Sequence, residues 1–269
     1  MIRGAVLGSP ITHSLSPVLH RAAYSFLGVE GSYQALEVRS GTLADFLERE
    51  SENFDYLSLT MPLKEEVLSL DVDIDSLVQR IQSGNTLIKR DGQWDLTSTD
   101  GSGFIEALRN SQKCSLNSVL VLGAGGTARA VCGALDSEVA RIDVLGRSSV
   151  RQAALESAIQ SSEFNYLRWS DAVDFDQYDL VVNTTPAGAA DLLATSVNLG
   201  VRATLFDVIY KPWPTQLAQR WSDCGGMVIS GLELLLYQGI DQLSLILPQI
   251  SDRRALADHL RPMLLTASR

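Results

Sequence analysis

The sequence predicts a two-lobed α/β protein whose last helices return to the first lobe. Short apolar, strand-like runs alternate with helical patterns along almost all of the 269 residues, which is typical of α/β proteins with parallel strands. This alternation breaks near residue 102 and then starts again, and at roughly 150 residues per domain the length suggests two domains. The last 35 or so residues form two helical patterns that have no strand of their own, so we expect them to pack on the first lobe, leaving a cleft between the lobes.

The first lobe contains the predicted elements of residues 1–102. RGAVLG at 3–8 predicts the first strand, and Ser16-Pro17 predicts the start of a helix, with the serine as N-cap and the proline at the first helical position. That helix should end near Gly28. Further strands are predicted at YQALEV (33–38) and YLSLT (56–60), and further helices at TLADFLERE (42–50) and from Pro62 onward. Asp91-Gly92, between two β-like runs, predicts a hairpin.

The second lobe, residues 103–235, repeats a strand–helix–strand pattern. After a helix and the polar segment RNSQKCSLNS (109–118), strands are expected in SVLVL, RIDVLG, YDLVVN and ATLFDV. Residues 236–269 carry the two final helices, within LELLLYQGIDQLSLIL and DRRALADHLRPMLL.

Composition excludes several classes of protein. The net charge of −10 disfavours a nucleic-acid partner, because phosphate binding depends on clustered Lys and Arg. Cys114, Cys132 and Cys224 are odd in number and show no metal-type spacing, so we expect reduced cysteines in a reducing compartment. No apolar run approaches the roughly 18 residues of a membrane span, and the start of the chain does not resemble a signal peptide. We therefore expect a cytoplasmic protein.

A glycine-rich turn follows the first strand of the second lobe. VLVLGAGGTARA places Gly123, Gly125 and Ala128 in the G-x-G-x-x-G/A register between a strand and a helix. In this context the glycines let the backbone approach a pyrophosphate at the helix N-terminus, as in Rossmann-type dinucleotide-binding folds. Glycines that serve only packing are the alternative.

The end of the next strand favours NADP as the cofactor. An NAD-binding protein usually has Asp or Glu there, to bind the ribose 2′-hydroxyl. This chain instead has Arg147, with Ser148 and Arg151 close behind. A guanidinium can bind a 2′-phosphate through two parallel hydrogen bonds, although a surface arginine is the simpler alternative.

Two residues of the first lobe are candidates for proton transfer. Lys64 lies near the start of a helix that follows a strand, where open α/β sheets bind ligands, and Asp100 lies at the end of the predicted hairpin. Such a pair could exchange a proton with a substrate oxygen. A solvated lysine and a helix-capping aspartate are the alternatives.

These motifs resemble, in order and along nearly the whole chain, those of the shikimate dehydrogenase family. The pattern G-x-P-I-x-H-S-x-S-P-x-x-H fits GSPITHSLSPVLH (8–20), N-V-T-x-P-x-K fits SLTMPLK (58–64), G-x-x-N-T corresponds to SGNTL (83–87), and N-T-D-x-x-G fits STDGSG (98–103). In the second lobe, GAGGTAR, GRSSVR, VNTTPAG and DVIYKPWPT correspond to the family's cofactor-side motifs, and GLELLLYQ (231–238) to G-x-x-M-L-x-x-Q.

The resemblance implies a function and a set of site residues. It implies an N-terminal substrate-binding and catalytic domain, a Rossmann-type NADP-binding domain, and the NADPH-dependent, reversible reduction of 3-dehydroshikimate to shikimate. The implied catalytic pair is Lys64 and Asp100. The implied substrate ligands are Ser14, Ser16, Thr60, Asn85, Tyr210 and Gln238. The implied cofactor-binding residues are Gly123, Ala124, Gly125, Gly126, Thr127, Ala128, Arg147, Ser148, Arg151, Thr184 and Gly231.

The resemblance implies a carboxylate substrate, no metal, no membrane, and a monomer or homodimer. Two serine hydroxyls at a helix N-terminus suit a carboxylate, while a plain N-cap is the alternative for Ser16. The chain departs from the family pattern at Ser58, Ser98 and Gly146, where the family has Asn, and at Leu234, where it has Met.

Three other functions compete with this one. A quinate/shikimate dehydrogenase paralogue would share the same motifs. A non-catalytic sensor of NADP and a small acid would not need both Lys64 and Asp100. A hydrolase with Ser14 as nucleophile and His13 as base lacks the G-x-S-x-G elbow, and neighbouring residues on one strand would point to opposite faces.

Overall fold

The computed structural model describes residues 1–111, 116–247 and 250–269, so Cys114 lies outside the described residues. The chain divides into two compact units. The first comprises Met1–Gly103 and Leu235–Arg269, and the second comprises Phe104–Leu234. The chain crosses from one unit to the other inside two helices, α5 (Asp100–Ser111) and α9 (Gly231–Ile246).

The first unit is built on a six-stranded sheet with the order β2-β1-β3-β5-β6-β4. Its strands are β1 (Ile2–Gly8), β2 (Gly31–Glu37), β3 (Tyr56–Leu59), β4 (Asp73–Ile74), β5 (Thr86–Arg90) and β6 (Gln93–Thr97). Strands β2, β1 and β3 are parallel, whereas β5 runs antiparallel to both β3 and β6. The predicted hairpin is confirmed: Asp91 and Gly92 join β5 to β6 and both have positive φ, as a two-residue turn of type I′ requires.

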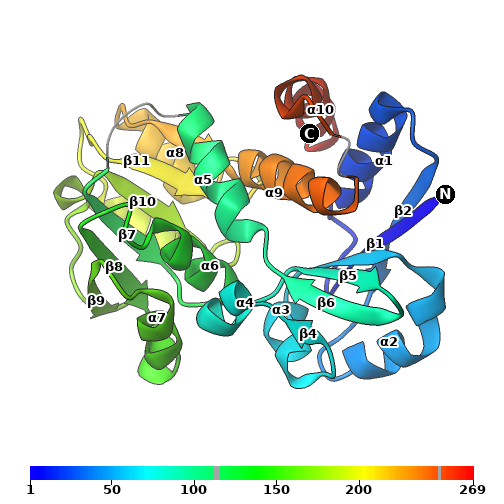
Figure 1. The fold of residues 1–269 in the computed structure, drawn as a ribbon. Helices are drawn as coiled ribbons and strands as arrows, with labels where there is room; N and C mark the ends of the chain where they lie inside the picture. The colour runs from blue at the N-terminus through cyan, green and yellow to red at the C-terminus, as the bar shows by residue number, and fades with distance from the viewer. Residues whose placement is uncertain (112–115, 248–249) are drawn as a thin grey trace. The chain divides into compact units, whose positions relative to one another are not determined.

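Helices cover both faces of this first sheet (Figure 1). They are α1 (Ser16–Leu27), α2 (Leu43–Glu50), α3 (Leu63–Glu66), α4 (Ser76–Ile81), most of α9 and α10 (Arg253–Ala267). Alternation along β3 separates two layers. Leu57 and Leu59 enter the apolar core formed with α2, α3 and α4, while Ser58 contacts Gln242 of α9 on the opposite face.

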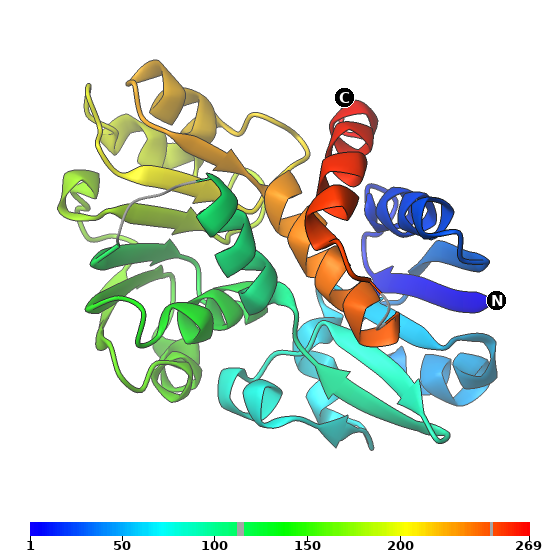
Figure 2. The same ribbon diagram turned by 45° about the horizontal axis from the view of Figure 1, so that its top comes forward.

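The C-terminal helices belong to the first unit. Helix α10 packs along α1, as the red and blue helices of Figure 2 show. Helix α9 approaches α1 closely at Gly239, where an added Cβ would lie 2.8 Å from Leu19 Cδ1. The absence of a side chain at Gly239 thus allows α9 to pack near α1.

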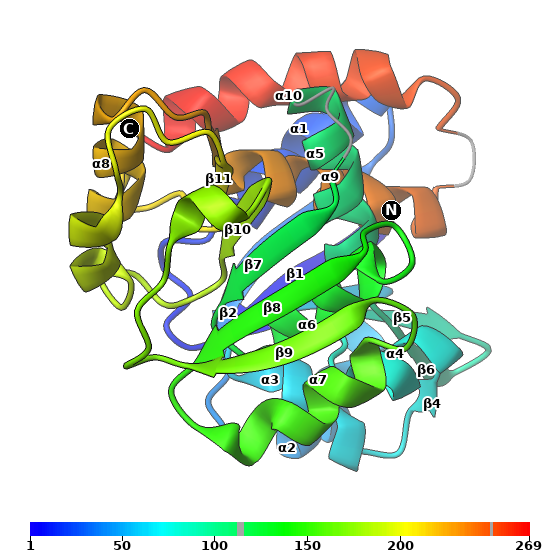
Figure 3. The ribbon, with the colours of Figure 1, turned by 90° about the vertical axis from the view of Figure 1, so that its left-hand side faces the viewer.

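The second unit contains a six-stranded, wholly parallel sheet with the order β12-β11-β10-β7-β8-β9 (Figure 3). The strands are β7 (Ser118–Leu122), β8 (Arg141–Gly146), β9 (Glu163–Arg168), β10 (Leu180–Asn183), β11 (Thr204–Asp207) and β12 (Val228–Ser230). Counted within this unit, the order is 3-2-1-4-5-6, which is that of the Rossmann fold. The fold class predicted from the sequence is therefore confirmed.

The helices of the second unit are α6 (Gly126–Leu135), α7 (Gln152–Ala158) and α8 (Gln216–Asp223), together with the last eight residues of α5. Short 3-10 helices are found at Ser51–Asn53, Val67–Ser69, Ser149–Arg151, Phe175–Gln177 and Asp191–Ser196. Buried residues of β7, β10, β11 and α8 form one core, in which Trp221 donates its indole N–H to the Ala203 carbonyl at 2.9 Å.

Three local predictions can be compared with the structure. Helix α1 begins at Ser16 itself, and its N-cap is Leu15 without a side-chain hydrogen bond, so the prediction of Ser16 as the cap is wrong and Pro17 is the second helical residue. Helix α5 extends through Ser111, so the first three residues of the predicted polar segment are helical. No helix in the described ranges combines the length and apolarity needed to cross a bilayer.

Candidate active site

The predicted substrate-side residues of the first unit gather at one edge of its sheet. Strands β1 and β3 are parallel neighbours, and the loops that follow them are joined by the bonds from Thr60 N–H to Leu7 O and from Ser9 N–H to Met61 O, of 2.9 and 3.0 Å. Asn85 precedes the antiparallel strand β5 and accepts the Leu59 N–H at 2.7 Å through its main-chain carbonyl. The main chains that carry Ser14, Thr60, Lys64 and Asn85 thus meet at this edge.

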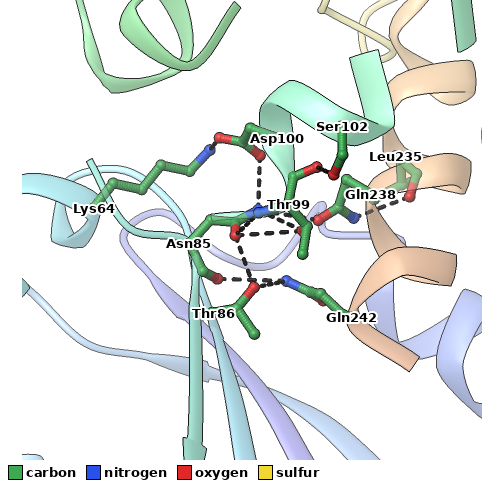
Figure 4. A network of polar contacts seen from close by, with 9 residues as sticks. All are labelled: Lys64, Asn85, Thr86, Thr99, Asp100, Ser102, Leu235, Gln238 and Gln242. Carbon is green, nitrogen blue, oxygen red and sulfur yellow. Dashed lines mark hydrogen bonds and ion pairs between the residues drawn. The ribbon is translucent and has the colours of Figure 1, made fainter. Parts of the chain in front are cut away.

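Lys64 and Asp100 form a buried ion pair (Figure 4). Lys64 Nζ contacts Asp100 Oδ2, and their side chains are only 16% and 6% exposed. The alternatives of a solvated lysine and a helix-capping aspartate are therefore wrong. A buried charge pair of this kind needs further hydrogen bonds to be stable, and Asn85 supplies one, its Nδ2 donating to Asp100 Oδ1 at 2.8 Å.

Gln238 also joins this group. Asn85 Nδ2 lies 3.4 Å from Gln238 Oε1, while Gln238 Nε2 donates to the Leu235 carbonyl of its own helix. Helix α5 passes α9 closely because residue 103 is glycine: a Cβ there would lie 2.4 Å from the Gln238 main-chain nitrogen. The structure therefore brings together Lys64, Asn85, Asp100 and Gln238.

The side-chain amide of Asn85 is held in one orientation. Its Oδ1 accepts hydrogen bonds from the Thr99 N–H at 2.8 Å and the Thr86 hydroxyl at 2.7 Å. A reversed amide would direct its NH₂ group at the Thr99 N–H, which can only donate. Nδ2 must therefore face Asp100.

The sequence interpretation missed Thr86, Thr99 and Gln242 in this network. Gln242 Nε2 donates to Thr86 Oγ1 at 2.9 Å, and Gln242 is 1% exposed. One signal was available, because Gln242 lies four residues after Gln238 and so on the same face of the helix.

Ser58, where the family pattern has Asn, extends the network away from Asn85. Its hydroxyl donates to Gln242 Oε1 at 2.7 Å and is 2.6 Å from the Tyr33 hydroxyl. The Tyr33 ring stacks on the His20 imidazole with a centroid distance of 3.9 Å. Complete burial lowers the pKa of His20 to about 3, although a hydrogen bond with Gln242 opposes this shift. The imidazole is therefore neutral.

Three predicted ligands carry hydroxyl groups at the same edge. Ser14 Oγ accepts the Ser16 N–H at 3.3 Å, so Ser14 rather than Ser16 satisfies a donor at the start of α1. The hydroxyls of Ser16 and Thr60 have no hydrogen-bond partner among the described residues. Both remain available to a ligand.

His13 does not form a nucleophile–base pair with Ser14. Both residues lie after the end of β1, in a segment that is not a strand, and His13 is exposed. The expectation that the two lie on opposite faces of one strand is therefore wrong. No hydrogen bond joins His13 to Ser14 in the described part of the chain.

In the second unit, the glycine-rich turn has the geometry that a pyrophosphate requires. Gly123 has φ +102°, and a Cβ there would lie 2.8 Å from Thr184 Oγ1. Helix α6 begins at Gly126, and its N-cap Gly125 makes no side-chain capping bond. The first N–H groups of a helix have no partner within it and attract anions. The cradle thus fits a dinucleotide.

The predicted cofactor residues surround this turn. Ala124 accepts a 3.4 Å hydrogen bond from Arg129, a buried arginine that the sequence interpretation did not include. Thr127 and Ala128 lie in the first turn of α6, and Thr184 follows β10, with its hydroxyl bonded to the Leu122 carbonyl at 2.8 Å. The turns after β7 and β10 adjoin where the strand order reverses, which is where Rossmann folds bind ligands.

The remaining predicted residues lie in three other loops of the second unit. Arg147, Ser148 and Arg151 are exposed after β8, and Arg147 makes no ion pair or hydrogen bond with the residues that the structure describes. Tyr210 is half-buried after β11. Gly231 begins α9, and a Cβ there would lie 2.1 Å from the Val208 carbonyl oxygen, so its lack of a side chain serves packing.

A buried acid, Asp207, orders the loops after β10 and β11. It accepts hydrogen bonds from Asn183 Nδ2, Thr215 Oγ1 and the Ile209 N–H at 3.0, 2.7 and 3.1 Å. Burial raises the pKa of this carboxyl, and the three bonds oppose the shift. These loops therefore have a common polar anchor.

Comparison with known proteins agrees with this arrangement. Residues 6–87 match the family model described as the shikimate dehydrogenase substrate binding domain. The chain is 34% identical over 253 residues to "Shikimate dehydrogenase (NADP(+))" of Methanosarcina acetivorans, covering 89% of this chain and 90% of that protein. With the protein of that name from Thermosynechococcus vestitus the identity is 36% over 256 residues, covering 91% and 89%.

A solved structure is similar over nearly the whole length. The shikimate 5-dehydrogenase of Thermus thermophilus, in complex with NADP(H) and shikimate, has a TM-score of 0.82 and 31% identity, and the match covers 98% of this chain and 100% of that one.

The fold and the two groups of residues define an α/β protein with a Rossmann-type nucleotide-binding unit and a second unit that carries a buried lysine–aspartate pair. More specifically, the identity to these relatives over most of their length places the chain in the shikimate dehydrogenase family.

Proposed function

We propose that the protein catalyses the reversible, NADPH-dependent reduction of 3-dehydroshikimate to shikimate. The observation that carries the proposal is the buried Lys64–Asp100 pair, with Asn85 bonded to Asp100 and Gln238 beside Asn85. Such a pair has an ionisable donor and acceptor in contact, which proton transfer to a substrate oxygen needs. A sensor that only binds would have no use for it.

The residues of the first unit divide the work on the substrate. Ser14, Ser16 and Thr60 offer hydroxyl groups to the substrate carboxylate and ring hydroxyls, while Asn85 and Gln238 offer amides. In the direction of reduction, Lys64 Nζ gives a proton to the substrate oxygen as the C=O double bond becomes a C–OH single bond. Asp100 accepts a hydrogen bond from Lys64 throughout and so holds its ammonium in place.

In this assignment the second unit binds the cofactor, and residues 1–102, 103–235 and 236–269 are the substrate domain, the NADP domain and the returning helices. NADPH, when bound, supplies the hydride that reaches the carbonyl carbon. The glycine-rich turn Gly123–Ala128 would hold its pyrophosphate, Arg147, Ser148 and Arg151 its 2′-phosphate, and Thr184, Tyr210 and Gly231 would lie along the remaining loops. We also propose a cytoplasmic location.

Steady-state kinetics test the proposal. Purified protein is mixed with shikimate or quinate, each with NADP or NAD, and absorbance is followed at the NADPH wavelength. We expect turnover with shikimate and NADP, and a loss of roughly 10²–10⁴-fold in Lys64→Ala with NADPH binding retained. Turnover with quinate alone would identify the paralogue instead, and no turnover with either substrate would support a sensor.

A further inference from the structure

Gly146 and Tyr166 fill one space between them. Gly146 ends β8 and stands where the family pattern has Asn. A Cβ added there would lie 1.9 Å from Tyr166 Oη and 2.6 Å from Tyr166 Cζ. Because Gly146 does not have a positive φ, its backbone does not require glycine. The Tyr166 side chain, from the neighbouring strand β9, takes the volume that an asparagine at 146 would need.

Tyr166 spends its hydroxyl on the loop that follows β8. Its Oη donates to the Ser148 carbonyl at 2.5 Å. The pairing of β8 with β9 ends here, its last bond running from Trp169 N–H to Gly146 O at 3.0 Å. The tyrosine bond therefore continues the attachment of the loop to the sheet one step beyond the strand.

The anchored loop carries the residues expected to meet a 2′-phosphate. Ser148 Oγ accepts the Val150 N–H at 3.3 Å and caps the 3-10 turn Ser149–Arg151. Arg151 Nη1 lies 3.4 Å from where a Cβ on Gly125 would be, so this arginine extends back over the glycine-rich turn. Fixing the Ser148 carbonyl thus sets the direction of both the serine side chain and the arginine-bearing turn.

We propose that Tyr166 is a positioning residue for recognition of a phosphate monoester on the adenosine ribose, a role for which this chain uses a tyrosine on β9 in place of an asparagine at 146. The inference rests on the proposed use of NADP. A loop held in its binding conformation loses less entropy when the ligand arrives, and a guanidinium held in place can make paired hydrogen bonds to phosphate. A nucleotide without the 2′-phosphate gains nothing from this order.

Binding measurements on the full chain test the role independently of turnover. Calorimetric titration gives the Kd of adenosine 2′,5′-bisphosphate and of AMP, and NADPH or NADH fluorescence gives the Kd of each dinucleotide. In Tyr166→Phe, which keeps the ring, we expect the Kd of the two 2′-phosphorylated ligands to rise about 2- to 12-fold, as one hydrogen bond predicts. The Kd values of AMP and NADH should stay within about two-fold.

A second pair of variants tests the shared space. Gly146→Asn should displace Tyr166 and weaken binding of the bisphosphate, whereas Gly146→Asn/Tyr166→Ala frees the space and should recover most of the loss. Tyr178→Phe is the matched control, since the Tyr178 hydroxyl bonds Asp143 in the same unit, at 2.6 Å, and its loss should leave the NADPH-to-NADH ratio unchanged.

The outcomes separate the two proposals. If wild type prefers NADPH but Tyr166→Phe weakens all four ligands equally or none, the role of Tyr166 is wrong and the function stands. If wild type shows no preference for NADPH, both the proposed cofactor and this role are wrong. A protein that prefers NADPH, responds to Tyr166→Phe as expected and turns over no substrate would overturn the function alone.

Discussion

Asn85 donates its side-chain amide to Asp100 Oδ1 at 2.8 Å, while Lys64 occupies the other oxygen of the same carboxylate. Both oxygens of Asp100 therefore face donors, and the Asn85 amide cannot reverse because Thr86 and Thr99 donate to its oxygen. The geometry around the proton-transferring pair is thus determined by groups that do not themselves react.

Replacing this carboxylate with its isostere should stop proton transfer. In Asp100→Asn an NH₂ group must face either Asn85 or Lys64, which are both donors. We expect kcat to fall by roughly 10²–10⁴-fold, with the Kd of NADPH unchanged. Asp73→Asn, at an exposed position of β4, is the control in the same steady-state assay. Near-normal kcat in Asp100→Asn would remove Asp100 from the mechanism.

Gln242 should act at a distance from the reacting atoms. Gln242→Met keeps the length of the side chain but leaves the Ser58 and Thr86 hydroxyls without this partner. The loss of buried hydrogen bonds should lower the free energy of unfolding by about 1–3 kcal/mol, measured by urea denaturation. The looser Asn85 should also lower kcat more than it raises KM. Gln219→Met, at an exposed position of α8, should change neither, and an unaltered kcat in Gln242→Met would limit the residue to a structural role.

Ser14 should contribute to substrate binding more than to turnover. Ser14→Ala removes a hydroxyl from the edge of the sheet and also the acceptor of the Ser16 N–H. We expect KM for shikimate to rise well above that of wild type while kcat at saturation changes little. Loss of the helix-end acceptor should cost about 0.5–2 kcal/mol of stability. A fall in kcat with constant KM would contradict the assignment of a carboxylate ligand.

Arg147 should decide between the two nicotinamide cofactors. Arg147→Asp replaces an exposed cation by an anion that repels a 2′-phosphate, so KM for NADPH should rise far more than KM for NADH. Equal changes in the two values would show that Arg147 does not contact that phosphate. Arg168→Asp, another exposed arginine in this unit, provides the charge-matched control.

Stability should fall in mild acid because of His20. Its folded-state pKa is about 3, below its ordinary value near 6.5, so the unfolded chain takes up a proton between these two values and the folded chain does not. Relative to His20→Gln, the free energy of unfolding of wild type should drop by about 1–2 kcal/mol between pH 6.5 and 5, since each pKa unit corresponds to about 1.4 kcal/mol. Parallel curves for the two proteins would mean that His20 becomes charged in the fold.

Local patterns in the sequence were enough to predict most of the strands and helices. The Asp91-Gly92 turn, the glycine-rich turn after β7 and the apolar runs of β1, β3, β7, β8, β10 and β11 act over a few residues, so their signals are visible in the chain itself. The elements that the interpretation missed are those whose patterns are weak. Strand β9 lies at a sheet edge and carries polar and aromatic residues together, and β12 has only three residues.

The sequence by itself determined the fold class, the family and the identity of the candidate residues, because these depend on residue types at fixed short spacings. Only the tertiary structure decided that Lys64 and Asp100 are paired, that Gln242 supports Asn85 from a helix 157 residues away along the chain, and that Tyr166 takes the space beside Gly146. Each of these contacts joins segments far apart in the chain, so each depends on packing and burial that no local pattern contains.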